Sequence, residues 1–236
     1  MRRIPNPELD FLVLNHLAEK YQLNQMRQAG EFHLSTGVYC LTKAFFDAKA
    51  PVLPTETEIM LFAVGLGLQD ILTPSSASTP VFEKDGVIYR PDFVLMLGDE
   101  EYHELKTTRM SLKTLLENLP ETWVEYIAGG CYMRDVLTYN LSTLLLMGSY
   151  APPFPKIYSE TLEFVPDELQ ANWDRILRRK VVYDAAMLND KCPAPFKYCK
   201  DWECKNCRYK LQCDVVVKLE TRKQAEEDVK TLWPEE

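Results

Sequence analysis

The sequence of 236 residues contains no long hydrophobic run, no internal repeat and no low-complexity segment. Its longest apolar stretch, near Leu141 to Met147, is far shorter than the roughly 20 residues that a transmembrane helix needs. The first twenty residues mix charged side chains with only a short apolar run, so we expect neither a secretory signal nor a transit peptide. These deficits predict a soluble, cytoplasmic protein with no membrane segment.

Positive charge is also scarce, and the formal net charge is -8 at pH 7. Proteins that coat nucleic acid without sequence preference depend on many phosphate contacts by Lys and Arg, so this class is disfavoured. A nuclease is not excluded, because an active site that holds divalent cations is itself acidic. Basic side chains do gather within residues 175–180 and 197–210, where solvated helix faces explain them as well as DNA contact does.

The composition, 46% hydrophobic and 26% charged, is that of an ordinary globular protein, so we do not expect disorder. Apolar residues at helical spacing predict helices over Pro5–Gln28, Ser35–Phe45, Thr55–Leu72, Ser111–Asn118, Pro120–Leu137 and Pro166–Leu188. Strand-like alternation predicts strands over Val81–Lys84, Val87–Leu97, Glu101–Thr108, Ser142–Met147 and Lys156–Phe164. The expected fold class is α/β (α+β), with helices flanking one mixed sheet. We expect a single domain with a helical part (1–72), a core (73–190) and a cysteine-rich tail (191–236).

Two acids and a lysine are predicted to meet at neighbouring strands of this core. Glu104 and Lys106 share one face of their strand because side chains alternate with period two, and Asp92 lies on the preceding strand. Such a set suits phosphodiester hydrolysis: the carboxylates and the carbonyl of Leu105 can hold Mg²⁺ or Mn²⁺, while the lysine orients water or stabilises phosphate charge. The alternative is an exposed ion pair beside an unrelated turn aspartate, and the strand-turn-strand context leaves the two interpretations about equal.

The seven cysteines are concentrated near the end of the chain. Five of them lie close together: Cys192, Cys199, Cys204, Cys207 and Cys213. The last three form a C-x₂-C-x₅-C pattern, whose spacing indicates metal binding without indicating which metal. A fourth ligand from Cys192 or Cys199 would make a local zinc site, whereas Cys40 would make a clamp between distant parts of the chain. Cys131, in a predicted core helix, is expected to be structural.

Taken together, these features resemble the RecB-like iron-sulfur exonucleases of the PD-(D/E)XK superfamily, notably the CRISPR-associated adaptation nuclease (the fourth Cas protein) and the AddB nuclease domain. The tail from Trp202 to Cys213 matches the family element Trp-x-Cys-x₂-Cys-x-Tyr-x₃-Cys, and the resemblance extends from about residue 37 to residue 213. It implies an iron-sulfur cluster, usually 4Fe-4S, that joins the N-terminal helices to the tail. The ligands it implies are Cys40, Cys204, Cys207 and Cys213.

The chain departs from the family pattern at two places. Gln69 stands where the family has a metal-binding histidine, and its amide oxygen can either coordinate Mg²⁺ or be an ordinary polar helix residue. The family's Gln-x₃-Tyr element is not visible, although Tyr126 or Tyr132 can replace part of it. These departures fit a relative encoded by a phage or another mobile element.

Side chains beside the acidic set are candidate DNA contacts. Arg90, Thr107, Thr108 and Arg109 flank it and can contact phosphates, though ordinary surface polarity explains them equally well. His103 lies on the strand face opposite Glu104, so we expect it to serve packing or the surface rather than catalysis.

The resemblance implies an exonuclease that degrades single-stranded DNA ends, as in CRISPR prespacer trimming or phage recombination and replication. A second hypothesis is a weakly active or inactive DNA-end binding subunit that serves an integrase or helicase. A third is a zinc-stabilised protein of another function in which Glu-x-Lys is accidental.

Overall fold

The computed structural model describes residues 7–26, 31–72, 80–97, 99–145, 156–193, 204 and 206–219. Its helices are α1 (Pro7–Met26), α2 (Leu34–Val38), α3 (Leu41–Lys49), α4 (Glu56–Leu72), α5 (Leu112–Glu117), α6 (Glu121–Arg134) and α7 (Pro166–Leu188). Its strands are β1 (Phe82–Lys84), β2 (Val87–Tyr89), β3 (Phe93–Leu97), β4 (Asp99–Thr108), β5 (Thr138–Leu145) and β6 (Lys156–Glu163). A further helical segment covers residues 210–219. In the described ranges, no helix is both long and apolar enough to cross a membrane.

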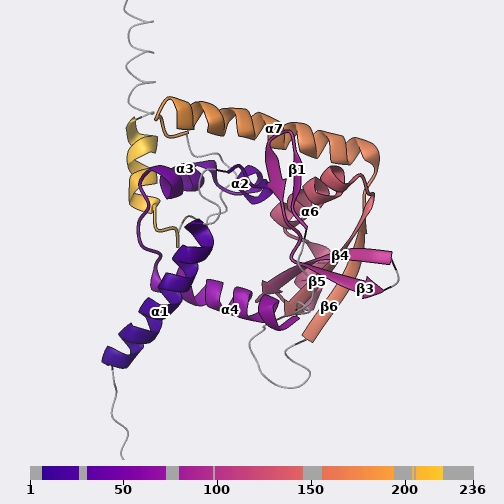
Figure 1. The fold of residues 1–236 in the computed structure, drawn as a ribbon, viewed down its shortest axis with the longest axis horizontal. Coiled ribbons are helices and arrows are strands. Elements are labelled where there is room, and N and C mark those ends of the chain that lie inside the picture. Colours follow the sequence, from indigo (N-terminus) through magenta and orange to yellow (C-terminus); the bar gives the residue numbers. More distant parts are fainter. Residues whose placement is uncertain are drawn as a thin grey trace, which may run out of the picture.

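The main sheet has the strand order β3-β4-β5-β6 and is mixed. β4 runs parallel to β5, while the β3/β4 and β5/β6 pairs are antiparallel. Parallel neighbours need a crossover connection, which α5 and α6 supply here. Helices flank the sheet, with α7 and α6 on one side of the molecule and α4 on another (Figure 1). The predicted combination of a mixed sheet with flanking helices is confirmed.

The strand predicted over Val87–Leu97 is wrong, because the structure divides it into β2 and β3. The break falls at Arg90-Pro91-Asp92, where the proline has no N–H to donate to a strand ladder. β2 pairs with β1 in a separate two-stranded sheet, and Ile88 of β2 also bridges to His33. The predicted single sheet is thus two sheets, and Asp92 stands at the junction between them.

The helix predicted over Ser35–Phe45 is likewise divided, into α2 and α3. Tyr39 adopts extended backbone angles at the break, and its carbonyl accepts a hydrogen bond from the buried Arg179 of α7. Cys40 follows as the N-cap of α3, and its Sγ accepts a hydrogen bond from the backbone N–H of Lys43 at 3.5 Å. The break turns Cys40 out of a helical face and places it at a helix start.

The hydrophobic core lies where α2, α6 and α7 meet the β1/β2 hairpin and β5. Trp173 of α7 is buried at its centre, and its Nε1 donates to Asp85 Oδ2 at 2.9 Å. Asp85 and Gly86 form the turn of the β1/β2 hairpin, with positive φ angles of 53° and 69°. The hairpin is therefore fixed to α7 through its own turn, which positions the end of β2 just before Asp92.

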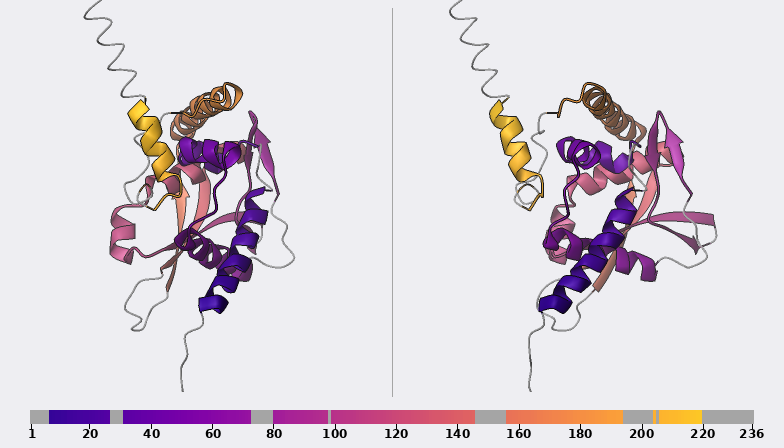
Figure 2. Two further views of the ribbon diagram at one scale, coloured as in Figure 1. Left: turned by 90° about the vertical axis from the view of Figure 1, so that its left-hand side faces the viewer. Right: turned by 60° about the vertical axis from the view of Figure 1, so that its left-hand side comes forward.

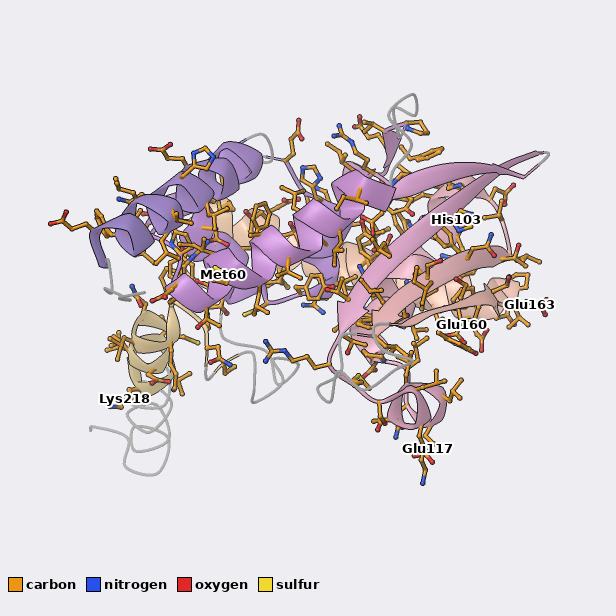
Figure 3. All side chains as sticks on the ribbon, turned by 90° about the horizontal axis from the view of Figure 1, so that it is seen from below. Met60, His103, Glu117, Glu160, Glu163 and Lys218 are labelled. Atoms are coloured by element: carbon orange, nitrogen blue, oxygen red, sulfur yellow. The ribbon has the colours of Figure 1, made fainter. Side chains whose placement is uncertain are left out.

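The C-terminal helical segment (residues 210–219) lies beside α3, far along the chain from it (Figure 2). Side chains from α3, α4 and residues 204–214 line one pocket, which confirms this neighbourhood. The start of α4 faces the same region, and Figure 3 shows Met60 of α4 near the segment that carries Lys218. Helices α3 and α4 thus meet the C-terminal segment at this pocket.

Candidate active site

Asp92, Glu104 and Lys106 lie together at the β3/β4 pair. Phe93 pairs with His103, so Asp92, one residue before Phe93, faces Glu104 across the two strands. The backbone N–H of Leu105 donates to Asp92 Oδ2 at 2.9 Å, which fixes that carboxylate. Lys106 Nζ forms an ion pair with Glu104 Oε1. The three side chains that the sequence singles out therefore form one cluster.

Glu104 is almost completely buried, with 1% of its surface exposed. One oxygen, Oε1, is paired with Lys106, but Oε2 is also buried and has no hydrogen-bond partner among the described residues. A buried carboxylate oxygen without a partner is costly. The atom lies in the acidic cluster with Asp92, which is where a bound cation would satisfy it.

Burial raises the pKa of Glu104 to about 8, with Lys106 acting in the opposite direction and Asp92 adding to the rise. Burial alone would lower the pKa of Lys106, but the neighbouring Glu104 outweighs it and the net pKa lies above the ordinary value. Tyr39 and Asp92 act on Lys106 in the same direction as Glu104. The cluster therefore sets two carboxyl groups against one ammonium, and a divalent cation would balance the second carboxylate.

Tyrosine rings surround the cluster, and the sequence analysis identified only one of them. Lys106 Nζ lies 5.2 Å from the ring centroid of Tyr126, whose hydroxyl donates to the carbonyl of Arg90 at 3.4 Å. The hydroxyls of Tyr89 and Tyr139 are hydrogen-bonded to each other. Burial raises the pKa of both phenols, and Glu104 raises it further, so both stay protonated. Their sequence signal, aromatic residues on strands, is indistinguishable from that of ordinary core positions.

The remaining predicted site residues lie around this cluster. Leu105 is buried between Glu104 and Lys106, and Arg109 is exposed just beyond the end of β4. Thr108 accepts a hydrogen bond from the backbone N–H of Met110 at 3.0 Å through its hydroxyl oxygen. His103, labelled in Figure 3, is buried on β4, as its expected packing role requires. Gln69 belongs to α4, but its side chain lies outside the described residues.

A second candidate site is formed by the four cysteines that the resemblance assigns to a cluster. All four line one pocket of about 310 Å³: Cys40, Cys204, Cys207 and Cys213. Each is half-buried. Burial and the three other thiols raise the pKa of Cys213 to about 11, so this thiol is protonated near neutral pH until a metal displaces its proton.

The other cysteines are placed differently. Cys192 is half-buried, and burial raises its pKa to about 11, with Cys213 and Cys40 raising it too, so its thiol is close to the pocket. Cys131 is completely buried in α6, as the sequence indicates. Cys199 lies outside the described residues.

The described side chains offer two kinds of donor set for metals. Among them, no group of three or more His, Cys, Asp or Glu is placed to hold a metal ion by itself. The oxygen pair of Asp92 and Glu104 suits Mg²⁺ or Mn²⁺, whose remaining ligands are commonly waters and substrate phosphates. The four thiols surround a cavity instead of converging on a point, which suits a cluster whose iron and sulfide atoms fill such a space.

Comparison with solved structures indicates a known fold. The structure of SSO0001 aligns with 86% of this chain over 96% of the length of SSO0001, at 16% identity and a TM-score of 0.51. An alkaline exonuclease from Laribacter hongkongensis covers 70% of this chain and 93% of its own, at 10% identity and a TM-score of 0.47. A phage-related exonuclease from Haemophilus somnus aligns with 71% of this chain over 99% of the exonuclease's length, at 10% identity and a TM-score of 0.39. No family model and no curated protein matches the sequence. The fold is thus similar to that of SSO0001.

Proposed function

We propose that this chain is a Mg²⁺- or Mn²⁺-dependent deoxyribonuclease of the PD-(D/E)XK type that shortens single-stranded DNA from an end. The observation that carries the proposal is the buried Glu104, whose Oε2 accepts no hydrogen bond from a described donor while Asp92 and Lys106 lie beside it. A structural ion pair would not need a second carboxylate at that point. A cation-binding hydrolytic site does need one.

In this mechanism Asp92 and Glu104 hold the cation, and the carbonyl of Leu105 adds an oxygen ligand. A cation held there would supply Lewis-acid chemistry toward a phosphoryl oxygen and would activate a water. Lys106 is paired with Glu104. Because a cation would neutralise Glu104, the ammonium of Lys106 could then orient the water or stabilise charge on the phosphate.

The DNA strand would reach this site along exposed basic groups and one half-buried tyrosine ring. The side chains of Arg90 and Arg109 are exposed on either side of the cluster and suit phosphate contacts. The ring of Tyr126, next to Lys106, offers a surface for base stacking. We place the activity in DNA-end processing, of the kind that CRISPR adaptation and phage recombination both require, with an integrase or recombination protein as partner.

The proposed cofactor of the second site is a 4Fe-4S cluster held by Cys40 and the three cysteines of the tail. The thiols come from α3 and from residues 204–213, so the cluster would tie the N-terminal helices to the C-terminal segment. Its role in this proposal is structural, because Lys106 and the carboxylates are supplied by the sheet and not by the pocket.

The second candidate function, a DNA-end binding subunit, is favoured by the pairing of Lys106 with Glu104 and by the lack of a third acidic or imidazole ligand among the described residues. Both functions predict DNA binding, so the distinction is catalytic. Binding of labelled single-stranded DNA in Ca²⁺, which does not support cleavage in many such sites, would measure affinity separately.

The deciding experiment is degradation of end-labelled single-stranded DNA with Mn²⁺ by wild type, Lys106→Ala and the control Lys113→Ala. We expect Lys106→Ala to lose activity by about 10²–10³-fold, as when one transition-state donor is removed. Lys113 is exposed on α5 and pairs only with Glu117, so its variant should cut like wild type. Full activity of Lys106→Ala would place the active site elsewhere. A wild-type chain that binds DNA but cuts it with no divalent metal would establish the binding subunit.

A further inference from the structure

The cysteine-rich tail is attached to α3 and α4 by contacts that involve no cysteine. Tyr209, between Cys207 and Cys213, is 1% exposed and its ring stacks on Phe46 of α3 with centroids 5.4 Å apart. Its hydroxyl donates to Asp47 Oδ1 at 2.7 Å and accepts from the backbone N–H of Val52 at 3.3 Å. A residue of the tail is therefore part of the packed interior.

Arg208 adds a charged connection at the same place. Its side chain is 6% exposed and forms an ion pair with Asp47, while a second nitrogen lies 3.8 Å from Glu58 Oε2. Glu58 also pairs with Lys43 Nζ at 3.4 Å. Two acids and two bases thus form one network across α3, α4 and the tail. Undocking the tail would leave Asp47 without its arginine and expose a ring that is now buried.

The arrangement is unlike a small metal site whose ligands meet only when the metal binds, since such sites have no other means of holding the chain. Here the buried pair Arg208-Tyr209 sits within the C-x₂-C-x₅-C pattern itself. Docking these two residues sets the cysteines on either side of them against Cys40.

From these contacts we infer that Arg208, Tyr209 and Asp47 form a metal-independent latch that docks the tail and presets the four-cysteine pocket before any cluster is present. These residues are positioning residues for the cluster. The use of the thiols rests on the proposed function, but the docking rests only on the latch contacts. Loss of the cluster would then leave the tail in place, with its thiols grouped for reloading.

The test is hydrogen-deuterium exchange of the full chain, followed in peptides that cover residues 206–214, with and without iron. In metal-free wild type the backbone amides of this segment should stay protected. In metal-free Asp47→Asn they should exchange at least about tenfold faster, since the latch opens without its charge. Asp184→Asn is the matched control, because Asp184 belongs to an exposed pair with Lys180 on α7 and should leave the segment unchanged.

Equal exchange in metal-free wild type and metal-free Asp47→Asn would overturn the latch. Tyr209→Phe is the second variant if Asp47→Asn does not fold, because it removes both hydroxyl hydrogen bonds and keeps the stacked ring. Assembly of the cluster from iron and sulfide should be slower in both latch variants. Iron content and visible absorbance measure this rate. A chain that takes up no iron but keeps the protected segment would refute the cluster and retain the latch, and nuclease activity enters neither outcome.

Discussion

At the scale of single residues, the site is governed by one buried carboxylate. Glu104 is surrounded by Lys106, Asp92 and tyrosine rings, and its second oxygen has no partner in the described structure. In the absence of a cation, burial favours its neutral form. Burial therefore disfavours the ionised form of Glu104, which is the form that the proposed cation binding requires. Such a raised pKa is common for functional acids.

This environment predicts a pH-dependent stability. The folded pKa of Glu104, about 8, lies above its unfolded value, so its contribution to folding is complete below about pH 4 and is lost as the pH rises through 8. In EDTA the melting temperature of wild type should fall between about pH 5 and pH 8, with a loss of a few kcal/mol from this group. Glu104→Gln should lack this slope, and Mg²⁺ at about pH 8 should restore wild type only. The same slope in Glu104→Gln would assign it to other groups.

At the scale of elements, α6 packs closely against the tyrosines beside the site. Gly129 and Gly130 lie on its buried side, and a Cβ added at Gly130 would come within 2.7 Å of the Tyr89 ring and 2.9 Å of its hydroxyl. Tyr89 is 1% exposed and bonded to Tyr139, so the ring cannot move aside easily. Close packing of this helix thus fixes the phenols that border Glu104.

Substitution of this glycine should be destabilising. Gly130→Ala is expected to lower the free energy of unfolding by about 1–3 kcal/mol through overpacking against Tyr89. Gly65→Ala in α4 is the control, because no atom lies within 4 Å of the added Cβ, and it should raise stability by about 0.5–1 kcal/mol. Chemical unfolding measures both. If Gly130→Ala were instead more stable than wild type, the close contact between α6 and Tyr89 would be contradicted.

At the scale of the whole molecule, the cysteine pocket joins segments that are distant in sequence. Cys40 begins α3, whereas its three companions follow α7 near the C-terminal end. The two alternatives for the fourth ligand require different cysteines. A local zinc site would need Cys192, whereas the clamp would need Cys40. Cys192 is close to both Cys40 and Cys213, so its position in the sequence does not decide between the alternatives. Replacing each cysteine in turn does.

Cys40→Ser should abolish iron binding and the broad absorbance expected near ~400 nm for thiolate-ligated iron. Cys192→Ser is the matched variant, and it should retain both. Iron analysis and absorption spectra of anaerobically purified protein provide the measurement. The reverse result, with iron or zinc lost only from Cys192→Ser, would make the site local and remove the clamp.

The sequence by itself determined features that depend on neighbouring residues. Alternation along one strand put Glu104 and Lys106 on the same face, and helical periodicity predicted α1, α4 and α7 closely. The breaks at Cys40 and Asp92 were not predicted. The break at Tyr39 depends on a partner elsewhere, since Arg179 holds its carbonyl. The break before Asp92 has a local signal, Pro91, which cannot donate to a strand ladder.

Tertiary structure alone decided what surrounds those residues. The phenols around Glu104 come from β2, α6 and β5, and the bond between Tyr209 and Asp47 spans 162 positions. Such contacts leave no local pattern, because a buried tyrosine on a strand has the same spacing whether it faces a core or a carboxylate. The sequence could therefore name the acids and the thiols, while the burial of Glu104 and the contacts of Arg208 and Tyr209 with Asp47 arise only when distant segments pack together.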